Sequence, residues 1–236
     1  MAAQDAAHQL ATVMGLDTRL RYGQRMSRLP HLRRDQLTPE GQVLWDAIAG
    51  IQIAGIDRSR LVQEDGSLTG PFNAWVHAPD TGKGLLALGG TLLGRTSIER
   101  RLIEIAILTV GARWQAEFEW AEHSQMALDH GVPDVVVNAI GSGEDPPFEA
   151  ADERVVHVVA SQLARTGRVD MDAYRAAREL LGDKGMVELV TLCGAYTMIS
   201  FQLNAFDVPL PPGAVPRWGN SPQDGAFRNV GAAPSV

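Results

Sequence analysis

Two neighbouring stretches decide the fold of this chain: Leu102-Ile103-Glu104-Ile105-Ala106-Ile107-Leu108 and Glu119-Trp120-Ala121-Glu122-His123. The first is apolar at nearly every position, which indicates a helix that is almost surrounded by protein. Glu104 interrupts it, and burying a charged carboxylate among Ile and Leu costs several kcal/mol unless the carboxylate is paired or protonated. In the second stretch, Glu119 and His123 lie four residues apart and share one helical face. We therefore predict that Glu104, Glu119 and His123 form an acid–base cluster.

Helix signals surround these stretches, and no alternating strand pattern of useful length occurs. Thr38-Pro39 predicts a helix start, and Thr96-Ser97-Ile98-Glu99 matches a capping box ahead of the apolar helix. Gly70-Pro71-Phe72-Asn73 is a breaker cluster, so we expect a loop-rich segment there. Further helices are predicted at about 115–130, 134–140, 150–166, 171–181 and 186–206. The sequence thus predicts an all-α protein of roughly seven or eight helices.

Composition limits the domain organisation and the classes of partner. We expect an N-terminal arm over 1–25, one helical domain over 26–210 and an extended, proline-rich tail over 211–236. A net charge of −7 argues against a nucleic-acid surface, which needs clustered Lys and Arg. The single cysteine, Cys193, excludes an internal disulfide framework. Because there is neither a long apolar run nor a secretory signal, we predict a cytoplasmic protein that does not span a membrane.

The segment from Arg95 to Gly131 resembles the carboxymuconolactone decarboxylase family, which shares its fold with the AhpD-type alkylhydroperoxidases. Glu104, the run Ala116–His123 and the closing Gly131 carry this resemblance, and 70–79 resembles the segment that precedes the core helices in many members. The resemblance implies an AhpD-like helical bundle. It also implies a homo-oligomer, a trimer or hexamer, with active sites near the subunit contacts.

The redox branch of this family has a Glu followed, about a dozen residues later, by Cys-x-x-Cys-x-x-x-His. On this chain the Glu falls on Glu104 and the His on His123, but the cysteine positions fall on Ala116 and Glu119. Thiol-based peroxide reduction needs a nucleophilic thiolate and a resolving partner. Cys193 lies in a different, apolar helix, which would raise the pKa of its thiol. The sequence therefore disfavours a peroxidase.

The leading hypothesis is a lyase, decarboxylase or isomerase that needs no cofactor and acts on a small carboxylated or lactone-type metabolite. Such chemistry moves a proton on and off carbon, which His and Glu with pKa values near neutrality can do. His123 would be the general acid or base, Glu119 would share proton transfer, and Glu104 would orient His123 or act as a second acid. Two alternatives stay open: an AhpD-like peroxidase, and an oligomeric scaffold without catalytic activity.

Other readings of the same residues also stay open. Glu119 and His123 form either a site or a solvated pair, and Glu104 is either catalytic or paired with a nearby arginine, namely Arg100, Arg101 or Arg113. Glu104, Glu119 and His123 would also suit a metal, although the resemblance points to metal-free chemistry. Four residues complete the predicted site as substrate contacts: Phe72, Asn73, His77 and Trp120.

Overall fold

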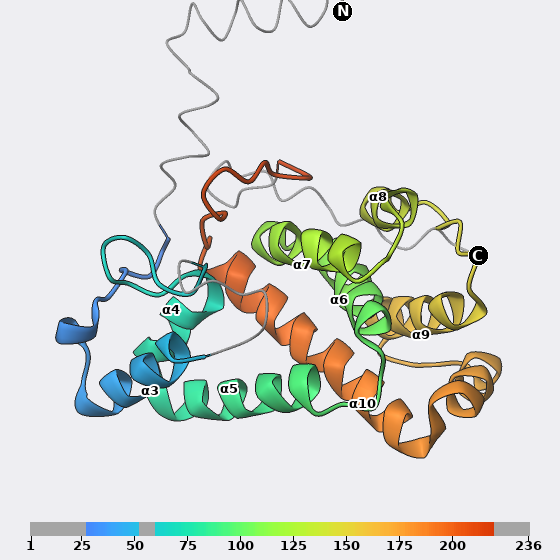
Figure 1. Ribbon diagram of the computed structural model, residues 1–236, viewed down its shortest axis with the longest axis horizontal. Coiled ribbons are helices and arrows are strands. Elements are labelled where there is room, and N and C mark those ends of the chain that lie inside the picture. The colour runs from blue at the N-terminus through green and yellow to red at the C-terminus, as the bar shows by residue number, and fades with distance from the viewer. Residues whose placement is uncertain (1–26, 52–59, 220–236) are drawn as a thin grey trace, which may run out of the picture.

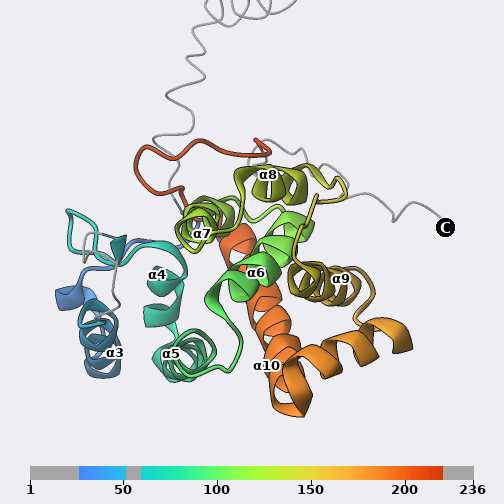
Figure 2. The same ribbon diagram turned by 45° about the vertical axis from the view of Figure 1, so that its right-hand side comes forward.

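One long helix, α10 (Met171–Ala205), runs through the molecule and separates two groups of helices (Figures 1 and 2). The computed structural model describes residues 27–51 and 60–219. Across these residues the secondary structure is helical apart from two isolated β-bridges, which confirms the all-α prediction. The predicted arm over 1–25 lies outside the described residues, as does the tail beyond 219.

The first group of helices packs around a small apolar core on one side of α10 (Figure 2). It consists of the short 3₁₀ helix η1 (Arg34–Gln36), α3 (Pro39–Ala49), α4 (Gly70–His77) and α5 (Pro79–Gly94). Thr38 caps α3 as predicted, because its hydroxyl accepts a hydrogen bond from the Gly41 amide. Leu44, Ile48 and Trp75 are among the buried residues of this core.

The predicted loop at 70–73 is wrong, because these residues begin α4. Pro71 lies in the first turn of α4. Backbone N–H groups have no hydrogen-bond partner within the helix at that position, so proline costs no helical hydrogen bond there. Gly70 has φ +56°, and a Cβ there would come within 2.5 Å of the Phe118 ring. Glycine at this position therefore allows α4 to approach the helix that carries Phe118. The Gly70-Pro71 pair therefore marks the start of a helix that packs closely against its neighbour, and not a loop between two elements.

The second group holds the main core, on the other side of α10. It consists of α6 (Arg100–Trp114), α7 (Glu117–Asp129), α8 (Asp134–Ser142) and α9 (Ala151–Thr166). Every residue of α6 from Leu102 to Gly111 is buried, as the nearly continuous apolar pattern predicts. Gln115 then adopts the left-handed conformation with φ 48°, which ends α6. The chain turns there, and α7 packs alongside α6.

The predicted capping box at 96–99 is wrong. Helix α6 begins at Arg100, and its N-cap residue Glu99 makes no side-chain capping bond. Glu188 on α10 instead accepts hydrogen bonds from the Ser97 amide at 2.9 Å, the Ser97 hydroxyl at 2.7 Å and the Thr96 hydroxyl at 3.0 Å. Hydrogen bonds from Ser97 are the main cause that lowers the pKa of Glu188 to about 2. A tertiary contact thus replaces the local one.

Helix α10 consists of two helical segments that meet at Gly182, where φ 67° and ψ 179° break the helical path. This agrees with the two separate helices predicted at 171–181 and 186–206. Within the described chain, α10 alone is long and apolar enough to cross a membrane, a property that core helices of soluble proteins share. Here Leu189 and Leu192 are buried in the main core, where α10 packs against α6 and α9.

After α10, the chain turns back over α7 (Figure 1), and Arg217 reaches Asn138 and Ser142 of α8. The carboxylate of Glu117 accepts hydrogen bonds from the backbone amides of Arg217 at 2.6 Å and Trp218 at 2.9 Å. The Trp218 indole donates to the Gly141 carbonyl at 3.0 Å, and its ring meets Trp120 edge to face at 5.1 Å. The described start of the predicted tail is therefore bound to the outside of α7 and α8.

Candidate active site

A cavity of about 480 Å³ lies between the two groups of helices, with α5 on one side, α7 on the other and α10 along its length. Most of its lining is apolar, including Leu85, Leu92 and Leu93 of α5 and Ile199 of α10. Its polar and ionisable lining residues come from α7, the start of α6, the chain before α4 and α10: Arg60, Thr69, Arg100, Glu119, Glu122, His123 and Tyr196. The cavity therefore combines an apolar body with a confined polar region.

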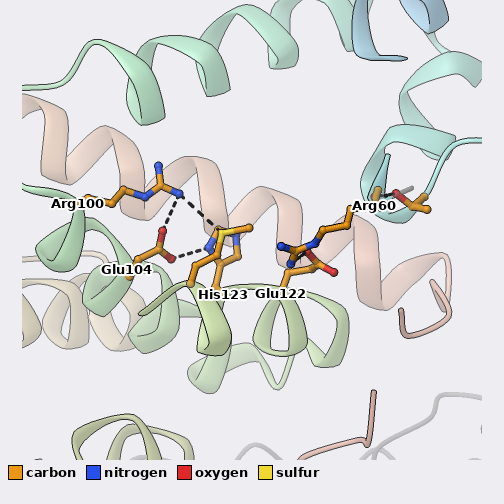
Figure 3. A network of polar contacts seen from close by, with 7 residues as sticks. Arg60, Arg100, Glu104, Glu122 and His123 are labelled. Atoms are coloured by element: carbon orange, nitrogen blue, oxygen red, sulfur yellow. Dashed lines mark hydrogen bonds and ion pairs between the residues drawn. The ribbon is translucent and has the colours of Figure 1, made fainter. Parts of the chain in front are cut away.

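His123 lies on the cavity side of α7 and is hydrogen-bonded to Glu104 (Figure 3). The distance from His123 Nδ1 to Glu104 Oε2 is 2.7 Å. Glu104 projects from the neighbouring helix α6, and its side chain is fully buried, whereas the His123 side chain keeps 12% exposure. The left-handed turn at Gln115 makes this pairing possible, because it folds α7 back along α6. Two of the three predicted cluster residues thus bind each other directly.

Glu104 is also paired with Arg100, one of the arginines that the sequence offered. The distance from Arg100 Nη2 to Glu104 Oε1 is 2.7 Å across one turn of α6. Arg101 instead binds Asp152 and Glu153. Burial raises the pKa of Glu104, but the charges of His123 and Arg100 and their hydrogen bonds outweigh it, so the pKa lies below its ordinary value. Glu104 is therefore an ionised carboxylate held inside the protein.

The pKa of Glu119 is shifted in the opposite direction. Its carboxyl group is buried and accepts hydrogen bonds from the Ser200 hydroxyl at 3.1 and 3.2 Å. Burial raises the pKa of Glu119 well above its ordinary value, and the Ser200 bond compensates only in part. A Cβ at Gly111 would lie 2.9 Å from Glu119 Oε1, so glycine there leaves room for the carboxyl group. Glu119 lines the cavity beside His123, but its partner is Ser200 and not His123.

Three lining residues of the polar region were missed by sequence reasoning. Tyr196 belongs to the buried main core and also lines the cavity, with its ring edge to face against His123 at 5.1 Å. Burial, followed by the negative charge of Glu104, raises the pKa of Tyr196 well above its ordinary value, so the phenol stays neutral. Arg60 is ion-paired with Glu122 next to His123 (Figure 3). No sequence signal links residues 62 positions apart.

Of the four predicted substrate contacts, one lines the cavity and three pack elsewhere in the protein. Phe72 lines the cavity. Asn73 is buried outside the lining, where it accepts a hydrogen bond from the Leu32 amide and donates one to the Pro30 carbonyl. His77 also contacts the Pro30 carbonyl, at 3.0 Å. Trp120 packs against Trp218. The structure thus places Asn73, His77 and Trp120 away from the cavity lining.

The structure also bears on thiol and metal chemistry. Cys193 is buried in α10, and burial raises the pKa of its thiol to about 12. A thiol in that state is a poor nucleophile. In residues 27–51 and 60–219, no group of three or more His, Cys, Asp or Glu side chains is arranged to hold a metal ion.

Known proteins were compared with the chain by sequence and by structure. No protein-family model matches it, and no curated protein matches it by sequence. Solved structures do match: the alkylhydroperoxidase AhpD core of a peroxidase-related protein from Ralstonia eutropha JMP134 has a TM-score of 0.64 at 12% identity, with 80% of this chain and 94% of that chain covered. The fold is AhpD-like. This bears out the predicted resemblance at the level of the fold.

A second solved structure supports the same conclusion. It is a protein of unknown function from Agrobacterium tumefaciens, described as a candidate antioxidant defence protein AhpD. Its TM-score is 0.54 at 18% identity, with 59% of this chain and 96% of that chain covered. At such low identities the likeness of both structures concerns the AhpD-like fold alone.

Proposed function

We propose that this protein is a cofactor-free lyase or isomerase in which His123 moves a proton on and off a carbon atom of the substrate. The observation that carries this proposal is the bond between His123 in the cavity and a fully buried, ionised Glu104. An ionised carboxylate only accepts hydrogen bonds, so His123 Nδ1 carries the hydrogen and donates it. The other ring nitrogen, Nε2, is then the one that can take a proton from a substrate.

Glu104 and Arg100 position and stabilise His123 rather than act on the substrate. The Glu104 carboxylate fixes the tautomer and orientation of the imidazole and stabilises the imidazolium that forms when His123 accepts a proton. The Arg100 guanidinium, 2.7 Å from the other oxygen of Glu104, keeps that carboxylate charged and in place. Of the two roles left open for Glu104, the structure therefore supports orientation and not that of a second acid.

Glu119 complements His123 as a proton donor. Its raised pKa keeps the carboxyl group protonated while Glu104 stays ionised, so the site holds an acid and a base at the same pH. Abstraction of a proton beside a carbonyl builds negative charge on the carbonyl oxygen, and a protonated Glu119 in the cavity wall can donate to that oxygen. A carboxylated or lactone-type metabolite offers such a carbonyl.

The alternatives find less support. The names of the structural neighbours concern peroxidases, but both motif thiols are absent from this sequence and Cys193 is a buried thiol of high pKa. A scaffold without catalytic activity predicts no cavity around the acid–base residues, whereas His123 and Glu119 line one. The expected trimer or hexamer and the cytoplasmic location stay predictions.

Replacing His123 by Ala tests the proposal. We expect kcat to fall about 10²–10⁴-fold while the circular dichroism spectrum stays unchanged. Turnover is measured by NMR as deuterium uptake from D₂O, or as product formation, on a panel of lactone acids and keto acids. His130→Ala is the matched control, because His130 is exposed at the end of the same helix. Equal turnover by the wild type and His123→Ala would remove the mechanism.

A further inference from the structure

The cavity is larger and more apolar than a small lactone acid requires. We propose that its ligand is an amphipathic anion, with one carboxylate-like head and an apolar body of on the order of ten carbon atoms. This inference rests on the proposed function in taking the cavity as the substrate site. It adds to that function the size, polarity and charge of the substrate, which the acid–base residues alone leave open.

The size and the apolar body follow from the volume and the lining. A volume of about 480 Å³ falls within the range of sites that hold drug-sized ligands. The apolar part of the lining is built by leucines of α5 and by Met198, Ile199 and Leu203 of α10, among others. A small, fully polar metabolite would leave this surface wet, whereas an aliphatic or aromatic body would cover it and displace the water.

The anionic head follows from the charges that face the cavity. Two guanidinium groups, Arg60 and Arg100, line the polar region. Glu122 is paired with Arg60, while Glu119 also lines the cavity but is held protonated. Glu104 balances Arg100 from behind and has no exposed surface. Each guanidinium group thus has a carboxylate partner, but both guanidinium groups line the cavity while Glu104 is out of a ligand's reach, so the charged hydrogen-bond groups offered to a ligand are mainly cationic, which favours an anion over a cation.

Arg60 is the group best placed to take the anionic head. Its side chain keeps 33% exposure, and that of its partner Glu122 keeps 19%, so neither is locked in the interior. The pair stands beside His123, on the face of α7 that is turned toward the cavity (Figure 3). A carboxylate bound to Arg60 would leave the rest of its molecule to lie past His123 and along α5. The geometry therefore puts the reacting carbon near the head.

Helix α5 offers a way to change the length of the apolar space without touching the acid–base residues. Gly89 lines the cavity, and a Cβ there would meet no heavy atom within 4 Å. It lies one turn from Leu85 and from Leu92, which line the same cavity. Gly84, in the same helix, is exposed, has equal space around it and lies outside the lining. Gly89→Leu therefore fills the cavity, and Gly84→Leu is its matched control.

Isothermal titration calorimetry with straight-chain carboxylates of four to fourteen carbons, each below its micelle concentration, tests the inference. We expect affinity to rise about fourfold per methylene until the cavity is full, and then to level off. In Gly89→Leu the plateau should move to chains about three to four carbons shorter, whereas Gly84→Leu should behave like wild type. Alkylamines of equal length should bind at least tenfold more weakly, and Arg60→Gln should weaken carboxylate binding while reducing that preference.

Binding that does not depend on chain length, equal affinity for amines and carboxylates, or a plateau unmoved by Gly89→Leu would each overturn the inference. The same titration on His123→Asn separates it from the proposed function. If that variant keeps both the chain-length series and the full turnover, the ligand class stands and the mechanism fails. If His123 proves essential for turnover but no chain-length series exists in the wild type, the mechanism stands and the ligand class fails.

Discussion

Replacing Glu104 by Gln removes one buried charge while keeping the shape of the side chain. Glu104 lies 2.7 Å from both His123 Nδ1 and Arg100 Nη2, and its side chain has no exposure. Breaking a buried ion pair costs about 3–5 kcal/mol, because the remaining charge loses its partner. The Arg100 side chain keeps 26% exposure, so water solvates part of its charge. We therefore expect a loss of about 3 kcal/mol, or about 6–12 °C in Tm for a protein of this size.

Urea unfolding followed by circular dichroism at pH 7 measures this loss, and Glu122→Gln is the control. Glu122 forms a partly exposed pair with Arg60, so its replacement should cost no more than about 1 kcal/mol. The pKa of Glu104 lies below its ordinary value of 4.5. Its contribution is therefore present above about pH 4.5 and is lost as the pH falls through the folded pKa. A loss under 1 kcal/mol at pH 7, or one that does not shrink toward pH 3, would refute the reasoning.

Three further outcomes follow from the same region of the structure. The pKa of Glu119 is raised above its ordinary value, so wild-type stability should fall as the pH rises from about 4.5 toward the folded pKa, by at most about 1.4 kcal/mol per pH unit. Glu119→Gln should lack this fall. Unfolding free energies measured in urea from pH 5 to 8 test this, and an equal pH dependence of the wild type and the variant would contradict it. Gly111→Ala should destabilise the protein by about 1–2 kcal/mol, because the new Cβ would lie 2.9 Å from Glu119 Oε1. In a Glu119→Ala background the higher helix propensity of Ala should make the same change neutral or stabilising, and a double-mutant cycle of unfolding free energies measures the difference. Cys193, with its pKa raised to about 12, should react with a thiol reagent at pH 8 only after unfolding in urea, and rapid labelling of the folded chain would count against this.

The sequence was enough to locate the helices other than α4 and α5, and to single out Glu104. An apolar run that tolerates one carboxylate indicates that the carboxylate has a partner, and Arg100 one turn earlier is that partner. Spacing within α7 was less informative. It put Glu119 and His123 on one face, but Glu119 binds Ser200 on α10 and His123 binds Glu104 on α6. Local periodicity shows which face a residue shares, whereas the partner depends on how the helices pack.

The errors have the same physical origin. The capping-box pattern at 96–99 was overridden by Glu188, which lies about 90 residues further along the chain. Asn73 was expected to contact a substrate because it lies in a segment predicted to be loop-rich, but in the structure its buried side chain is hydrogen-bonded to residues 30 and 32. The pair of Arg60 and Glu122 joins two segments that no short-range rule connects. The long-range polar contacts could therefore not be predicted from the sequence, although the hydrophobic pattern that brings those segments together could be.

The bound chain after α10 holds the Trp218 ring against Trp120. This pair of indoles gives the protein an intrinsic spectroscopic probe. Two indoles 5.1 Å apart at an interplanar angle of 68° couple their electronic transitions, so the pair should contribute an exciton couplet to the circular dichroism spectrum. Trp120 belongs to the helix that carries His123 and Glu119. Any molecule whose arrival displaces α7 would change the amplitude of that couplet, with no label attached and no turnover required.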